Sequence, residues 1–169
     1  YLRDCLEGFV MQQTDFPYVA IVHDDASTDH SADIIREYAA KYPDIIRPIY
    51  ETENQYSKSD GSLGRIMNAA VDATGAKYIA MCEGDDYWTD PRKLQKQIDI
   101  LESDTTLMAV VTDTSVVDNN GNVIIPKRGD IVKDSIEGRY TLRDFFGTPQ
   151  HAYPTASVVY RNEHQQDIR

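Results

Sequence analysis

Apolar and polar positions alternate along the chain in segments that predict a regular succession of strands and helices. Short apolar runs typical of strands lie at residues 18–23, 45–50, 78–82, 107–117, 123–125 and 156–160. Apolar residues at helical spacing lie at residues 1–13, 30–41, 63–74, 91–103 and 142–146. Because strands and helices alternate through residue 103, the pattern predicts an α/β fold with a mostly parallel sheet. The tetrapeptide at residues 118–121, Asp-Asn-Asn-Gly, predicts a late antiparallel hairpin.

Local signals set the expected ends of several of these elements. Ser27 or Asp29 is expected to cap the second helix, and Gly75 is expected to end the third. Pro91 is expected to take the first helical position of the fourth helix. Pro48 indicates that the strand at residues 45–50 lies at an edge of the sheet, because proline cannot donate to a strand ladder.

Length, charge and cysteine content narrow the functional classes. A chain of 169 residues is long enough for one domain with a core. The formal net charge of −11 disfavours a nucleic-acid backbone or an anionic membrane surface as the main partner, although it permits a nucleotide. No apolar run reaches transmembrane length, and no signal peptide is visible. Cys5 and Cys82 lie in an expected helix and strand, which is typical of a reduced intracellular protein without a disulfide framework.

The chain opens without a methionine, at a residue that already belongs to the first predicted helix. An α/β domain that begins with a helix usually lacks the strand that precedes it. We therefore expect the sequence to be a piece of a longer protein.

An acidic turn is the first candidate site. Glu83, Asp85 and Asp86 follow the apolar run at residues 78–82 directly. Adjacent carboxylates repel one another, and a bound cation relieves that repulsion. Mg²⁺ often takes only one or two carboxylates from protein and completes its shell with substrate phosphate oxygens. The turn therefore suggests a metal–diphosphate site, although taken alone it is more typical of a solvated turn in which Asp90 caps the next helix.

A second acidic cluster changes this balance. Asp24 and Asp25 follow another predicted strand, and open α/β sheets bind ligands beyond the carboxyl ends of their strands. Asp25 at such an end can accept the imide N–H of a uracil ring. The sequence contains neither a P-loop nor a Gly-x-Gly-x-x-Gly motif, which leaves a metal as the expected phosphate partner.

Two motifs together resemble glycosyltransferase family 2. They are His-Asp-Asp-Ala-Ser-Thr-Asp at residues 23–29 and Glu-Gly-Asp-Asp-Tyr-Trp-Thr-Asp-Pro-Arg-Lys-Leu at residues 83–94. The second motif, with residues 53–58 and 75–80, is similar to the bacterial branch of the family that carries a Glu-Gly-Asp-Asp-Tyr-Trp core. The resemblance covers residues 1–117 and 150–162. It implies a GT-A fold, a Rossmann-like α/β/α sandwich, formed by one domain with a nucleotide-sugar half at 1–103 and a partial acceptor half at 104–169.

The resemblance also implies roles for individual positions. The residues that correspond to donor contacts of the family are Asp24, Asp25, Lys58, Arg65 and Asp85. Asp85 and Asp86 correspond to its metal-binding motif, which holds Mg²⁺ or Mn²⁺ on the diphosphate; Asp86 is expected to coordinate the metal, and Asp85 to contact a donor hydroxyl as well. For Arg65 and Lys58 the alternative is an ordinary exposed cation. Trp88 is expected to be a packing anchor, and Cys82 a small buried filler.

The catalytic base is not recognisable. The family's base is a carboxylate well after the metal motif, and Asp144, Glu163 and Asp167 are candidates that lack the expected context. The family's first strand is missing as well, so we expect the chain to be truncated at both ends, with its base beyond the sequence.

The resemblance implies inverting transfer of a sugar from a nucleotide diphosphate, expected to be a UDP-sugar, to a saccharide or lipid-linked acceptor hydroxyl. The implied setting is cell-surface polysaccharide synthesis in the cytoplasm at the inner face of the membrane, with room for peripheral membrane association and for a homodimer. A nucleotidyltransferase and a non-catalytic sugar- or nucleotide-binding module remain the alternatives.

Overall fold

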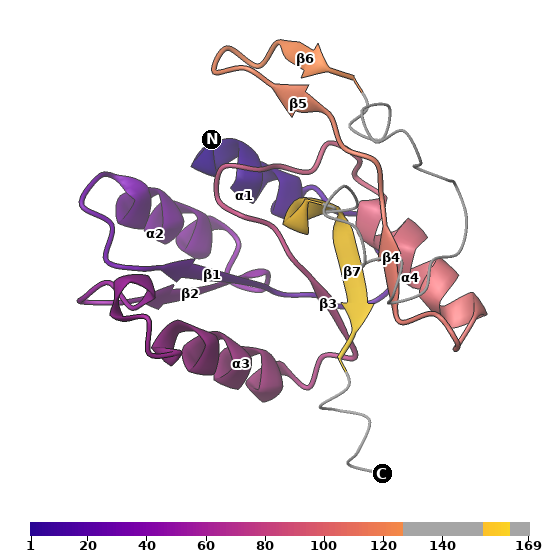
Figure 1. Ribbon diagram of the computed structural model, residues 1–169, viewed down its shortest axis with the longest axis horizontal. Coiled ribbons are helices and arrows are strands. Elements are labelled where there is room, and N and C mark those ends of the chain that lie inside the picture. Colours follow the sequence, from indigo (N-terminus) through magenta and orange to yellow (C-terminus); the bar gives the residue numbers. More distant parts are fainter. Residues whose placement is uncertain (127–153, 163–169) are drawn as a thin grey trace.

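The computed structural model describes residues 1–126 and 154–162 of the chain (Figure 1). Its helices are α1 (Leu2–Val10), α2 (Ser31–Lys41), α3 (Ser62–Thr74) and α4 (Lys93–Ser103), with short 3₁₀ turns at Tyr56–Lys58 and Thr155–Ser157. Its strands are β1 (Ala20–Asp24), β2 (Ile46–Tyr50), β3 (Tyr78–Ala80), β4 (Ala109–Val111), β5 (Val116–Val117), β6 (Val123–Ile125) and β7 (Val158–Arg161). The helix expected at residues 142–146 lies outside the described residues.

The sheet topology is mixed, which corrects the expectation of a mostly parallel sheet. β1 and β2 pair in parallel, whereas β7 lies between β3 and β4 and runs antiparallel to both. β3 and β4 therefore point the same way, as an alternating pattern of strands and helices predicts, but a strand from the end of the chain separates them. β5 and β6 form the antiparallel hairpin expected around Gly121, which takes φ 80° in the turn.

Helices cover both faces of the β1–β2 pair. In Figure 1, α2 lies on one side of these two strands and α3 on the other, whereas α4 packs against β4 and β7. α1 contacts α2. This layered arrangement agrees with an α/β/α sandwich. Among the described residues no helix is long and apolar enough to cross a lipid bilayer.

The core joins both halves of the chain. Leu6, Ile46, Leu101 and Val159 are among the largest fully buried side chains. Trp88 is 8% exposed and meets the Phe9 ring edge-on, with ring centroids 5.0 Å apart, so the expectation that it anchors the packing is confirmed.

Several expected boundaries hold and two do not. Gly75 ends α3 in the left-handed conformation, and Pro48 lies in β2, which pairs with β1 alone within the described part of the chain. Pro91 is not helical: Lys93 begins α4, because the N–H groups of Arg92 and Lys93 close a turn on Asp90. The N-cap position of α2 is His30 rather than Ser27 or Asp29, although the Asp29 side chain accepts the N–H of Ser31, the first residue of the helix, at 2.9 Å.

Candidate functional site

The carboxyl end of β1 places two acidic residues differently. Asp24 is 5% exposed, and its backbone carbonyl accepts the N–H of Glu51, which extends the pairing with the chain that leaves β2. Asp25 is half-buried and belongs to the next turn, where Ala26 takes a φ of 60° in the left-handed region. This change of backbone direction separates the environments of the two neighbouring carboxylates.

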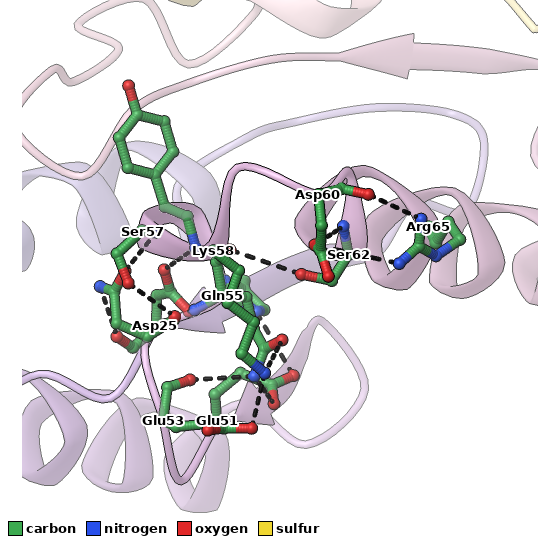
Figure 2. A network of polar contacts seen from close by, with 12 residues as sticks. Asp25, Glu51, Glu53, Gln55, Ser57, Lys58, Asp60, Ser62 and Arg65 are labelled. Carbon is green, nitrogen blue, oxygen red and sulfur yellow. Dashed lines mark hydrogen bonds and ion pairs between the residues drawn. The ribbon is translucent and has the colours of Figure 1, made fainter.

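Asp25 clamps the loop that follows β2 (Figure 2). One carboxylate oxygen accepts the N–H of Gln55 at 2.6 Å, and the other accepts the N–H of Tyr56 at 2.9 Å. These backbone donors, with Gln55 first, hold the pKa of the Asp25 carboxyl below its usual range. The carboxylate is therefore ionised at neutral pH, and each oxygen keeps a further acceptor lone pair.

The same loop and the helix that follows it carry the two cations that the sequence analysis singled out, Lys58 and Arg65. Lys58 Nζ lies 2.5 Å from Glu53 Oε1 and donates to Gln55 Oε1 at 3.0 Å. Arg65, in the first turns of α3, donates to the backbone carbonyl of Asp60 at 3.0 Å and remains 69% exposed. Figure 2 shows both cations in the polar network that begins at Asp25. The structure thus brings together three of the predicted donor contacts.

His23 belongs to this region and was not singled out by sequence reasoning. Its Nε2 atom is buried and is the one such side-chain atom without a hydrogen-bond partner in the described ranges 1–126 and 154–162. Glu51 Oε1 lies 3.6 Å from this atom. A histidine within an apolar strand run, next to two aspartates, was the available signal.

The acidic turn is closed by its own backbone. The N–H of Asp86 donates to the carbonyl of Glu83 at 3.1 Å. Asp85 is exposed and Asp86 is half-buried. The Glu83 carbonyl also accepts weak hydrogen bonds from two thiols, Cys5 at 3.5 Å and Cys82 at 3.6 Å. The Cys5 thiol, followed by burial, raises the pKa of the Cys82 thiol well above its usual range, so the resting form of Cys82 is the protonated thiol.

One face of α1 supports the whole segment from residue 82 to residue 94. Cys5 and Gly8 lie on that face, and Gln12 follows shortly after the end of the helix. A Cβ on Gly8 would lie 2.9 Å from the backbone nitrogen of Trp88. The Gln12 side chain donates to the carbonyls of Gly8 and Asp90, each at 3.0 Å, and accepts the N–H of Leu94 at 3.1 Å. Sequence reasoning missed this support, although the spacing of these residues was readable.

Lys93 brings a buried cation close behind the acidic turn. It is 6% exposed, donates to Gln97 Oε1 at 2.6 Å, and lies over the Trp88 ring with Nζ 4.5 Å from the centroid. Burial lowers the pKa of Lys93 to about 8. Lys93 begins α4 on the buried face of that helix, which also carries Gln97 and Leu101.

The carboxylates of the acidic turn suit a metal ion whose ligands come partly from the protein and partly from a substrate. Among the described residues no three His, Cys, Asp or Glu side chains are arranged to hold a metal ion by themselves. Asp85 and Asp86 offer two adjacent carboxylates, and Mg²⁺ usually combines one or two carboxylates with phosphate oxygens and water. The turn therefore suits a metal–diphosphate complex better than a free-standing metal site.

A hollow of about 790 Å³ begins directly after the turn. Residues 87–89, the exposed side of α1 and the β5–β6 turn at 117–121 line it. Aromatic rings, carboxylates and side-chain amides share this lining, a mixture suited to polyhydroxylated ligands. The candidate bases Asp144, Glu163 and Asp167 lie outside the described residues.

Comparison with known proteins gives one family and several relatives. The model of the family described as Glycosyl transferase family 2 matches residues 1–164. An uncharacterized protein of Mycobacterium tuberculosis is 35% identical over 173 residues, which covers 99% of this chain and 45% of that protein. The putative glycosyltransferase EpsE of Bacillus subtilis is 33% identical over 120 residues, covering 71% of this chain and 40% of the relative.

The name of a more distant relative states the polymer that it makes. The chondroitin synthase of Escherichia coli is 27% identical over 124 residues, which covers 73% of this chain and 17% of that enzyme. The chain thus spans less than half the length of these curated relatives.

Proposed function

Because this chain belongs to glycosyl transferase family 2, we propose that it forms the nucleotide-sugar-binding part of an inverting, metal-dependent glycosyltransferase with the GT-A fold. The supporting observation is the pair of acidic strand ends: the clamped Asp25 after β1 and the two carboxylates of the turn after β3. In this proposal the donor half spans residues 1–103, and residues 104–169 begin the acceptor half.

The end of β1 and its loop bind the nucleotide in this proposal. Asp25, with Asp24 behind it, accepts the imide N–H of a uracil through its remaining lone pairs. Lys58 and Arg65 exchange their present partners, Glu53 and Asp60, for oxygens of the donor diphosphate. Both present pairs are exposed at the surface, where an ion pair contributes little, so this exchange costs little free energy.

The turn after β3 holds the diphosphate. Asp86, and with it Asp85, would hold Mg²⁺ or Mn²⁺, and that ion supplies charge stabilisation to the leaving nucleoside diphosphate when bound. Asp85, which is exposed, also accepts a hydroxyl of the donor sugar. The protein's own contribution is positional: the Asp86–Glu83 backbone bond and the supporting face of α1 fix where the two carboxylates lie.

The acceptor is a saccharide or lipid-linked hydroxyl in this proposal, and the hollow beside Tyr87 is where it would approach. Inversion requires a carboxylate base on the face opposite the leaving group. That base belongs to the part of the protein beyond the described residues. The chondroitin synthase among the relatives favours polysaccharide synthesis, which would take place at the cytoplasmic face of a membrane with peripheral association.

Two other functions make different predictions. A nucleotidyltransferase would bind a nucleoside triphosphate through a glycine-rich basic loop, which the sequence lacks. A non-catalytic binding module would bind sugar or nucleotide without need of a metal.

Thermal melting with ligands tests the proposal. The protein is titrated with UDP and with GDP, each with and without Mn²⁺. We expect the melting temperature to rise with UDP and Mn²⁺ together, by more than with either alone or with GDP. A nucleotide response that ignores Mn²⁺ would support the binding module, and no response to any nucleotide would contradict the proposal.

A further inference from the structure

The chain's two cysteines meet at one atom. Cys5 lies on α1 and Cys82 lies just after β3, far apart in sequence, yet both thiols donate to the carbonyl oxygen of Glu83, at 3.5 and 3.6 Å. Both cysteines are free. Two thiols that share one acceptor are already gathered for a reaction with each other.

The surroundings hold this pair in place. Leu2 and Gly8, on either side of Cys5 along α1, contact the turn that follows Cys82: a Cβ on Gly84 would lie 3.7 Å from Leu2 Cδ1, and Gly8 abuts the Trp88 backbone. Cys5 is 2% exposed, whereas Cys82 is only partly buried. Small molecules therefore reach Cys82, while Cys5 meets only its neighbours.

We propose that Cys5 and Cys82 form a thiol modification site that closes to an intramolecular disulfide by exchange with low-molecular-weight disulfides such as oxidised glutathione. In the first step the sulfur of Cys82 bonds to one sulfur of oxidised glutathione. The glutathione S–S bond breaks, and one reduced glutathione leaves with the proton of the Cys82 thiol.

In the second step the sulfur of Cys5 attacks Cys82 Sγ. The Cys5–Cys82 bond forms, and the second glutathione leaves with the proton of the Cys5 thiol. The two protein thiols lose two electrons in total, which reduce one oxidised glutathione to two molecules of reduced glutathione.

Closure has a defined structural consequence. It links α1 covalently to the residue that precedes the acidic turn, across a contact that is otherwise held by packing and hydrogen bonds. A cross-link between residues so distant in sequence restricts the unfolded chain, so the closed form should melt at a higher temperature. This inference concerns the thiols alone and does not depend on the proposed function.

Peptide mapping after redox equilibration tests the site. The protein is incubated at several ratios of reduced to oxidised glutathione, free thiols are alkylated, and peptides are identified by mass spectrometry. We expect a cross-linked peptide pair that contains Cys5 and Cys82, together with a higher melting temperature that reducing agent reverses. Neither readout requires nucleotide, metal or sugar, so failure here is distinguishable from failure of the glycosyltransferase proposal.

Two single variants separate the steps. Cys5→Ser should stop at a glutathione adduct on Cys82, and Cys82→Ser should leave Cys5 unmodified because it is buried. A glutathione adduct that persists on Cys82 in the native protein, alkylation of both thiols under fully oxidising conditions, or closure without a rise in melting temperature would each overturn the proposal. The native protein alone suffices for these outcomes if a variant does not fold.

Discussion

Gly8 of α1 packs directly against the backbone of Trp88, so closely that a Cβ on Gly8 would lie 2.9 Å from the Trp88 nitrogen and 3.0 Å from its carbonyl oxygen. Trp88 follows the candidate metal ligands by two residues, and its indole N–H donates to the carbonyl of Ala156 at 2.9 Å. The absence of a side chain at Gly8 therefore allows the Trp88 backbone, and with it the acidic turn, to pack directly against α1.

Gly8→Ala is expected to destabilise the protein by about 1–2 kcal/mol. Alanine favours the helix by up to about 1 kcal/mol, but its methyl group must push the Trp88 backbone outward, and overpacking costs about 1–3 kcal/mol. Urea unfolding measures the difference. The matched control is Gly64→Ala in α3, where a Cβ would meet nothing within 4 Å, so the same substitution should stabilise the protein. Stabilisation by both substitutions would show that α1 and Trp88 do not pack as described.

Gln12→Ala is expected to destabilise the protein by about 1–3 kcal/mol, because its buried amide makes three hydrogen bonds that no other group replaces. The exposed neighbour Gln13 is the control, and Gln13→Ala should change the free energy of unfolding by less than about 0.5 kcal/mol. Chemical unfolding compares the two. Equal effects would mean that the bonds from Gln12 to Asp90 and Leu94 do not hold the segment in place.

The two hydrogen bonds by which the Asp25 carboxylate holds the loop at residues 51–58 should weaken at low pH. Hydrogen bonds from Gln55 and Tyr56 lower the pKa of Asp25 in the folded protein, so the stabilising effect of the carboxylate is full above the pKa of the unfolded chain, near pH 4. That effect is lost as pH falls through the lower pKa of the folded protein. Asp25→Asn, which can accept only one of the two N–H groups through its side-chain carbonyl, should therefore differ most from the native protein near pH 7.

Unfolding measurements from pH 7 down to pH 3, with limited proteolysis of the loop, check this prediction. Asp44→Asn, at an exposed carboxylate before β2, is the control and should leave loop cleavage unchanged. A gap between native and Asp25→Asn protein that widens as pH falls would contradict the clamp.

Lys93 should give the protein an alkaline gain in stability. Burial lowers its pKa in the folded protein from 10.5 to about 8, so between those values the unfolded chain binds the proton and the folded protein does not. The free energy of unfolding therefore rises with pH in this range, by at most about 3 kcal/mol. Lys93→Met should remove this rise, whereas Lys96→Met, at an exposed site on the same helix, should keep it. Urea unfolding at pH 7.5 and 9.5 measures this rise in the free energy of unfolding. An equal rise in Lys93→Met and in the native protein would contradict the assignment to Lys93.

Local sequence patterns predicted most of the helices and strands. The left-handed end of α3 at Gly75 and the hairpin around Gly121 were readable because each depends on a few neighbouring residues. The position of β7 between β3 and β4 could not be predicted from the sequence, because it depends on contacts between distant parts of the chain. A period-two pattern of apolar residues predicts a strand but not the strands with which it pairs. The same limit hid the meeting of Cys5 with Cys82.

The candidate site divides in the same way. The motifs singled out Asp25 and Asp86 as candidate site residues. They did not reveal that the backbone N–H groups of residues 55 and 56 donate hydrogen bonds to the Asp25 carboxylate. Nor did they reveal that Gly8 of α1, and Gln12 just after that helix, support the acidic turn and the residues that follow it. Sequence motifs name the charged groups, whereas the uncharged residues that position them emerge only from packing.

Calorimetric titration of UDP in the presence of Mn²⁺, carried out on the native protein and on Asp86→Ala, tests the central claim most directly. A carboxylate that helps to hold the metal on the diphosphate should cost at least about tenfold in UDP affinity when removed, or about 1.4 kcal/mol. Asp44→Ala, which removes an exposed carboxylate elsewhere, should bind like the native protein. The account predicts Mn²⁺-dependent UDP binding that is lost in Asp86→Ala and kept in Asp44→Ala; equal Mn²⁺-dependent affinity in all three proteins would contradict it.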